Sequence, residues 1–179
     1  QTFTADETGA FLTSLDLYFA SKPSTQDNLT VQIRPTQLGT PTLQLVQDFA
    51  EVVLSPDQVN VSEDATVATK VVLPSPLFLE PGVTYAVVLL APTTDDYEAW
   101  IARMGEENVT GLVQEAGGAV IISQQYLNGS LFKSQNGQIW TPSQFEDLKF
   151  TLYKAQFTNQ NGTVFLENPP QDTDTRLVN

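Results

Sequence analysis

The chain has 179 residues, a length typical of one domain, and its composition of 41% hydrophobic and 16% charged residues is that of a folded protein. Eight Lys and Arg stand against 21 Asp and Glu, so the formal net charge is −13. Such a charge repels phosphate backbones and anionic lipid, and we therefore expect neither a nucleic-acid partner nor a membrane partner. The absence of Cys and His excludes disulfides, Cys nucleophiles, zinc fingers and Ser-His-Asp triads.

The first strand signal is a period of two near the start of the chain, where Phe11, Leu15, Leu17 and Phe19 share one face. This period is typical of a strand with one buried face. The stretch 85–90 is apolar at every position, which predicts a central strand that is covered on both sides. Further strands are expected at residues 29–34, 67–73, 97–104, 119–123, 130–134 and 148–157.

The expected strand at 29–34 also alternates, with Leu29, Val31 and Ile33 directed inward and Arg34 directed outward. In the next strand, Val67, Val71 and Leu73 are the residues expected to point inward. The stretch 97–104 fits the helix period as well as the strand period, and we predict a strand there.

Turn residues separate these strands at short intervals. Asn128-Gly129, Asn136-Gly137 and Asn161-Gly162 predict two-residue hairpin turns of type I′, in which both residues take positive φ. The Pro-Ser-Pro stretch at 74–76 lacks amide hydrogens that a central strand needs, so it predicts a strand end or an edge strand. Ser55 and the following Pro predict one helical turn, with Ser55 as its N-cap.

These patterns predict an all-β fold of about nine to eleven short strands with little or no helix, arranged as an antiparallel β-sandwich of the jelly-roll kind. We expect residues 1–157 to form the sandwich. Residues 158–179 are expected to hold a final hairpin strand and a polar linker to a following domain. The chain begins at Gln1 without a Met, and we expect it to be part of a longer polypeptide.

Four aromatic side chains are candidate ligand-binding residues: Tyr97, Trp100, Tyr126 and Trp140. Aromatic rings present flat apolar faces that suit the C–H faces of pyranose sugars. The alternative interpretation is that both Trp residues pack at the ends of the sandwich and bind nothing.

Asp95, Asp96 and Glu98 are candidate ligands for calcium, a hard ion that takes clustered carboxylate oxygens. The chain has no Asp-x-Asp-x-Asp-Gly loop, and acids that hydrogen-bond their own turn explain the run as well. We therefore predict no cofactor, with calcium as the alternative.

Enzymatic activity in this chain would rest on carboxylates, since hydrolysis of a glycosidic bond needs an acid and a base or nucleophile. The candidates in expected loops or strand ends are Asp57, Asp95, Asp96, Glu98, Glu106, Glu146 and Asp147. No spacing distinguishes them from solvated surface charge. We therefore do not expect an enzyme.

Eight stretches carry a resemblance to a known family: residues 1–5, 9–20, 31–34, 74–90, 100–106, 130–136, 140–141 and 147–154. Together they resemble a β-sandwich module of tailed-phage virion proteins, and are similar to modules in large structural proteins of cyanophages and T4-like marine phages. The resemblance extends over most of residues 1–157 and fades in the C-terminal stretch.

The resemblance implies a non-enzymatic structural module of a tail, baseplate or fibre-associated protein, located in the virion and extracellular when it functions. It implies other virion proteins as partners, with a homo-oligomer as one form of assembly, and it transfers no catalytic residue. A carbohydrate-binding module that recognises a host surface glycan is the alternative. A secreted glycoprotein is a further one, because Asn28, Asn60, Asn108, Asn128 and Asn161 each precede Ser or Thr by two positions.

Overall fold

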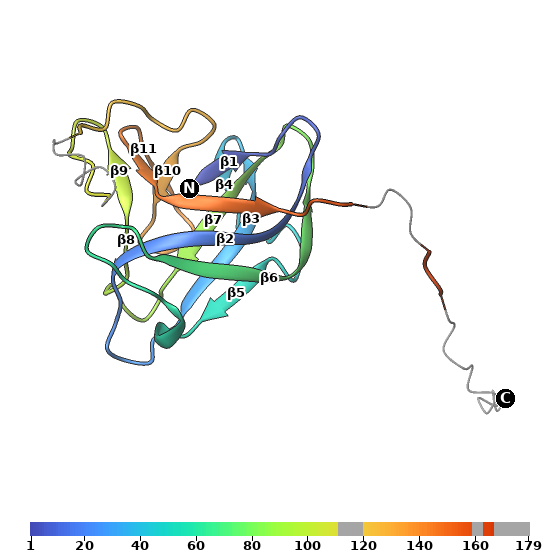
Figure 1. Ribbon diagram of the computed structural model, residues 1–179, viewed down its shortest axis with the longest axis horizontal. Helices are drawn as coiled ribbons and strands as arrows, with labels where there is room; N and C mark the ends of the chain where they lie inside the picture. Colours follow the sequence, from blue (N-terminus) through green and yellow to red (C-terminus); the bar gives the residue numbers. More distant parts are fainter. Residues whose placement is uncertain (111–119, 159–162, 167–179) are drawn as a thin grey trace.

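The computed structural model describes residues 1–110, 120–158 and 163–166. Within these residues the chain is nearly all β, with one short 3₁₀ turn and no α-helix (Figure 1). No helix among them is long and apolar enough to cross a membrane. The strands are β1 (Thr2–Thr4), β2 (Ala10–Ser21), β3 (Leu29–Gln37), β4 (Thr40–Pro41), β5 (Glu51–Leu54), β6 (Ala68–Leu79), β7 (Thr84–Leu90), β8 (Glu98–Ala99), β9 (Ile101–Arg103), β10 (Leu131–Lys133), β11 (Thr141–Ser143), β12 (Glu146–Leu148) and β13 (Phe150–Lys154).

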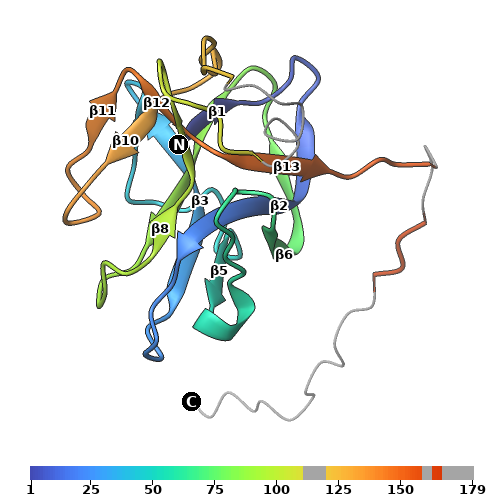
Figure 2. The same cartoon turned by 60° about the vertical axis from the view of Figure 1, so that its left-hand side comes forward.

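Two antiparallel sheets form the body of the molecule as a β-sandwich (Figure 1). One sheet has the order β1-β7-β3-β4, with β5 also paired to β3, and the other has the order β13-β2-β6, with β8 also paired to β2. Two separate strand pairs, β10 with β11 and β9 with β12, complete the structure. Figure 2 shows β10, β11 and β12 together at the end of the sandwich where β1 lies. The predicted all-β antiparallel sandwich is confirmed, while its jelly-roll connectivity stays a prediction.

The predicted inward faces of the two long strands build one continuous core. Leu15, Leu17 and Phe19 on β2 are at most 1% exposed, which confirms their prediction. Residues from both sheets contribute to this core. Its largest buried side chains also include Leu12, Leu29, Val31, Ile33, Val59, Val71, Leu77 and Val87. Burial of apolar side chains from both sheets supplies the main favourable free energy of folding.

Phe11 does not follow the predicted alternation. A β-bulge between Leu12 and Ser14 shifts the register of β2 against β6, so that Leu12 points inward at 2% exposure and Phe11 points outward at 38%. The extra residue of a bulge reverses which face the neighbouring side chains occupy. On the outer face Phe11 packs against Phe78, its partner on β6, with ring centroids 5.0 Å apart.

Strand β6 is an edge strand of its sheet, as the Pro-Ser-Pro stretch at 74–76 predicts. Val71 and Leu73 are buried, whereas Val67 precedes the strand and is 45% exposed, contrary to its expected inward position. Strand β7 lies between β1 and β3, and Ala86 and Val88 on its second face are buried along with Tyr85 and Val87, which confirms a strand covered on both sides.

The predicted helical turn and the predicted strand at 97–104 both form. Ser55 is the N-cap of the 3₁₀ turn η1 (Pro56–Gln58), and its amide donates a 2.9 Å hydrogen bond to Oε1 of Gln58. The stretch 97–104 forms β8 and β9 in place of a helix, with Trp100 between the two strands.

The type I′ turn forms at a place that the Asn-Gly pairs do not mark. Leu38 and Gly39, which join β3 to β4, both take positive φ, at 52° and 77°. Within Asn136-Gly137 only the glycine has positive φ, and within Asn128-Gly129 neither residue does, so the prediction of I′ turns there is wrong. The pair Asn161-Gly162 lies outside the described residues.

The described strands all fall within the expected sandwich of residues 1–157. Of the expected final hairpin and linker at 158–179, the structure describes only 158 and 163–166, and none of these residues is in a strand. Val164, Phe165 and Leu166 are 79%, 88% and 92% exposed.

Candidate functional site

A pocket of about 630 Å³ lies where β3 and the end of β7 meet the loop after β10. Its volume falls in the range that small-molecule and saccharide sites occupy. Apolar walls are supplied by Leu43, Leu89, Leu90 and Phe132. The polar lining comes mainly from Arg34 on β3 and from the loop residues Ser134, Gln135, Asn136 and Gln138.

Arg34 is the one charged side chain of the pocket that the fold encloses. It lies on the outward face of β3, as expected, yet it is only 5% exposed because other parts of the chain cover it. Its Nε donates to Oε1 of Gln32 at 2.7 Å, and its Nη1 donates to the carbonyl oxygens of Thr42 at 3.1 Å and Gly137 at 3.5 Å. Desolvation by burial lowers the pKa of the guanidinium, and the charge of Glu51 acts in the opposite direction.

Asn136 shapes the loop that forms one wall of the pocket. Its Oδ1 accepts hydrogen bonds from the amides of Gln138 at 3.0 Å and Ile139 at 2.9 Å, and from the hydroxyl of Ser134 at 3.2 Å. This is the local side-chain capping that Asn favours in turns. Gly137 takes φ of +68°, which brings its carbonyl group toward Arg34. The Asn-Gly pair therefore lies in the longer hairpin loop 134–140, which joins β10 to β11 and lines the pocket, and not in a two-residue turn.

Trp140 is the predicted aromatic that lies at this pocket. It follows the loop and contributes to the pocket lining. Its indole Nε1 is buried and has no hydrogen-bond partner among the described residues. A buried donor without a partner loses its hydration with no hydrogen bond in return, so burial of this N–H opposes folding.

Tyr97 and Trp100 lie elsewhere, with their polar atoms bonded to the backbone. The hydroxyl of Tyr97 donates to the carbonyl oxygen of Asp27 at 2.7 Å, and Nε1 of Trp100 donates to the carbonyl oxygen of Ser62 at 2.9 Å. Tyr97 also packs edge-on against the core residue Phe19, at 6.2 Å between centroids. Neither residue lines the pocket of Trp140, and both have the contacts of packed aromatics.

Tyr126 occupies a third location, in a smaller hollow of about 380 Å³ beside Asp147. Its ring packs edge-on against Phe150, at 5.7 Å between centroids, and it is 37% exposed. Burial raises the pKa of its phenol, and the charge of Asp147 adds to this effect. The four predicted aromatics are therefore spread over separate environments, and only Trp140 belongs to the largest pocket described above.

The candidate calcium ligands Asp95, Asp96 and Glu98 are all exposed. The amide of Asp96 donates to Oγ1 of Thr94 at 3.1 Å, and its carbonyl oxygen accepts from the hydroxyl of Ser21 at 2.7 Å, so this run behaves as a hydrogen-bonded turn. Nowhere in residues 1–110, 120–158 and 163–166 do three or more Asp, Glu, His or Cys side chains gather closely enough to hold a metal ion. The calcium hypothesis stays a prediction.

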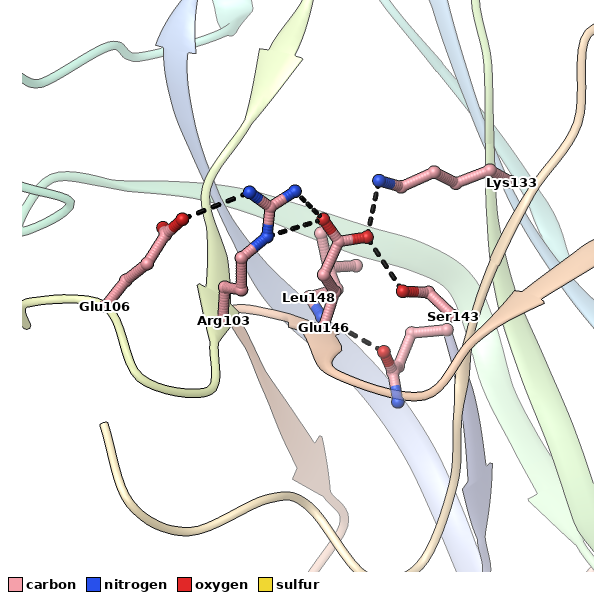
Figure 3. A network of polar contacts seen from close by, with 7 residues as sticks. Arg103, Glu106, Lys133, Ser143, Glu146 and Leu148 are labelled. Atoms are coloured by element: carbon pink, nitrogen blue, oxygen red, sulfur yellow. Dashed lines mark hydrogen bonds and ion pairs between the residues drawn. The ribbon is translucent and has the colours of Figure 1, made fainter. Parts of the chain in front are cut away.

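Glu146 is the buried carboxylate of the described chain with the densest set of partners (Figure 3). Its Oε1 accepts from Nε of Arg103 at 3.0 Å and pairs with Nη2 of the same residue. Its Oε2 pairs with Nζ of Lys133 and accepts from the hydroxyl of Ser143 at 2.8 Å. The partners come from β9, β10 and β11, so this one carboxylate on β12 connects the two small strand pairs.

These contacts fix the protonation state of Glu146. Hydrogen bonds from Lys133, Arg103 and Ser143 lower its pKa to about 2, from an ordinary value of 4.5. A catalytic acid needs the opposite shift, toward a carboxyl that is protonated near neutral pH. Glu146 was among the carboxylates considered for catalysis, and its surroundings suit a structural role.

Arg34 was missed by the sequence analysis as a pocket residue. Strand alternation placed it on the outward face, which is correct, but alternation carries no information about a loop a hundred residues away that covers this face. No signal in the sequence distinguished it, because other cations of the chain, such as Lys70 and Arg103, also lie in strands.

The chain was compared with protein-family models, with curated proteins and with solved structures, and none of the three comparisons found a match.

Proposed function

We propose that this domain is a non-enzymatic structural module of a tailed-phage virion protein, of the tail, baseplate or fibre-associated kind. The sequence resemblance suggests the class of protein. The hydrogen bonds and ion pairs that Glu146 makes are the structural observation that supports a structural role. Glu146 uses both carboxylate oxygens to hold three short strands at one end of the sandwich. A carboxylate whose two oxygens are both bonded in this way stabilises the end of the domain and is not available for proton transfer.

Immunogold electron microscopy tests this proposal directly. Antibodies raised against the purified domain are expected to label the tail of intact particles of the phage that encodes the chain. Pre-immune serum is the matched control for non-specific adsorption. Label on the capsid alone, or label on no part of the particle, would show that the proposed location is wrong.

A second candidate function is recognition of a host surface glycan, and the pocket beside Trp140 is the observation that favours it. A saccharide site typically offers an apolar or aromatic surface with a few convergent polar groups. Here Phe132 and Trp140 supply the aromatic part of the lining, and Gln135, Asn136 and Gln138 supply amide groups. The module would then attach the particle to its host as well as form part of it.

A glycan array probed with the purified domain, with and without calcium, tests this second candidate. Saturable binding is expected, and Trp140→Ala is expected to abolish it. Trp100→Ala is the matched control, because Trp100 is the other Trp of the chain and does not line the pocket. Equal loss in both variants would place the effect on folding, and the absence of binding to every glycan would leave the structural role alone.

A further inference from the structure

We propose that the pocket beside Trp140 recognises the carboxylate of an acidic saccharide, such as a uronic acid, and that Arg34 is the residue that binds it. This inference deepens the saccharide-binding candidate above and rests on it. Three observations carry it: the state of the Arg34 guanidinium, the charge of the pocket lining and the chemistry of its rim.

The guanidinium of Arg34 has one nitrogen left over for a ligand. Among the described residues Nε and Nη1 have carbonyl or amide oxygen partners, whereas Nη2 has none. The buried side-chain atoms that lack a hydrogen-bond partner do not include Nη2, so this nitrogen is not fully enclosed. Arg34 is 5% exposed and lines the pocket, and we infer that Nη2 is the part of its guanidinium that faces the pocket.

The bonds that Arg34 does make hold its fork in a fixed position. Gln32 fixes Nε, and the carbonyl groups of Thr42 and Gly137 fix Nη1. A fixed guanidinium loses little side-chain entropy when it binds, and the two N–H groups of Nη2 are charged donors that a carboxylate can accept. No carboxylate lies within ion-pair distance of Arg34 in the described part of the chain. The buried positive charge is therefore not neutralised by a direct partner.

The pocket differs in charge from the rest of the protein. The chain carries 21 acidic and 8 basic residues, yet no residue that lines the pocket is Asp or Glu, and two are basic, Arg34 and Lys133. The ammonium of Lys133 is paired with Glu146, which leaves Arg34 as the cation that acts on the pocket. Glu51 influences Arg34 through its charge without forming a direct pair, and its own oxygen accepts from Nε2 of Gln32.

The rim of the pocket favours a sugar over an acidic peptide as the carrier of the carboxylate. Gln135 and Gln138 are exposed side chains with both donor and acceptor atoms, which match hydroxyl groups that also donate and accept. Leu90, Phe132 and Trp140 supply apolar surface for the C–H face of a ring. A sugar ring offers several hydroxyl groups to these amides, whereas an acidic peptide offers mainly carboxylates and backbone groups.

The decisive experiment compares D-glucuronate with D-glucuronamide, which replaces the carboxylate by a neutral group of the same shape. Binding of each is followed by isothermal titration calorimetry and by amide chemical shifts, with the wild-type domain at fixed ionic strength. Glucuronate is expected to bind about 10- to 100-fold more tightly than glucuronamide, the difference that a charge-assisted hydrogen bond contributes. Shifted amides are expected in residues 134–138.

Variants assign the effect to Arg34. Arg34→Gln is expected to remove the preference for glucuronate, and Arg34→Lys, which retains the charge without the fork, is expected to weaken it. Lys154→Gln removes the same charge from an exposed ion pair with Asp6 and is the matched control, with an expected affinity within about twofold of wild type. If Arg34→Gln does not fold, Arg34→Lys and the comparison of the two sugars still test the proposal.

Equal affinity for the two sugars would overturn the inference about the carboxylate and would leave the saccharide-binding function standing. The absence of binding to both would overturn the inference as well. The glycan array and the immunogold labelling then decide independently on the second and the first proposed function. A preference for glucuronate that survives in Arg34→Gln would show that another residue recognises the charge.

Discussion

The backbone of Thr2 approaches Gly129 so closely that a Cβ on this glycine would lie 1.9 Å from the carbonyl oxygen of Thr2. Beside this contact the amide of Thr2 donates to the carbonyl oxygen of Ser130 at 2.9 Å, and the amide of Ser130 donates to Oγ1 of Thr2 at 2.8 Å. These hydrogen bonds hold the segment before β10 against the edge strand β1. Gly129 is needed here for space, and not for a positive φ.

Gly129→Ala is expected to destabilise the domain. Relief of the clash requires the segment to move away from β1 and lengthens the bonds between Thr2 and Ser130, at a cost of about 1–3 kcal/mol, as for other overpacked sites. Urea unfolding followed by Trp fluorescence measures the change. Asn128→Ala is the control at the neighbouring exposed position, and equal midpoints for the two variants would contradict the prediction.

Leu38→Asn is expected to stabilise the domain. Leu38 takes φ of 52° in the turn between β3 and β4, and its side chain is 100% exposed, so it adopts an unfavourable backbone conformation without making contacts in return. Asn tolerates this conformation better than Leu, and we expect a gain of about 0.5–1 kcal/mol in the free energy of unfolding. Leu127→Asn changes another exposed Leu, at 92%, which lacks positive φ, and is expected to give no such gain.

The contribution of Glu146 to stability is expected to depend on pH. Its pKa is lowered to about 2 in the folded protein from an ordinary 4.5, so its ionised form is favoured by folding. The stabilisation is therefore fully present above about pH 4.5 and is lost as the pH falls toward 2. Hydrogen bonds with Glu146 and Glu106 raise the pKa of Arg103 above its ordinary value, so its guanidinium stays charged throughout this window.

Glu146→Gln tests this expectation. Near neutral pH the variant is expected to lose about 1–3 kcal/mol, because Lys133 and Arg103 lose a charged acceptor. The difference from wild type should shrink in urea titrations as the pH is lowered from 5 to about 2.5. Glu106→Gln removes the exposed acid that also pairs with Arg103 and should have little effect at any pH. A difference for Glu146→Gln that is constant with pH would contradict the assignment.

The two Trp residues are expected to differ in the stability that each loses when its indole N–H is removed. Trp100→Phe removes a 2.9 Å hydrogen bond and leaves the carbonyl oxygen of Ser62 without this donor. Trp140→Phe instead removes a buried donor that has no partner among the described residues. We expect Trp100→Phe to cost about 1 kcal/mol more than Trp140→Phe in urea unfolding. Equal costs would show that Nε1 of Trp140 finds a partner in solution.

The alternation of apolar residues determined the sheet class and most of the core. Leu15, Leu17 and Phe19 lie where a period of two places them, because side chains of a strand alternate between faces. The buried strand β7 was predicted by a different signal, its continuous apolar run. Phe11 does not follow the alternation, because the bulge in β2 depends on the partner strand β6, and not on the residues of β2 alone.

The site, in contrast, was decided by tertiary structure. The sequence alone supplied Trp140 as a candidate and the Asn136-Gly137 pair as a turn signal. Only the fold brings the loop around that pair over Arg34, since the Gly137 carbonyl and the guanidinium come from positions 103 residues apart. Likewise, Glu146 was one of seven candidate carboxylates in the sequence, and only its burial beside Arg103 and Lys133 distinguished it from the others. Local periodicity determines which face a side chain occupies, whereas the packing of distant segments determines what covers that face and what charge it meets.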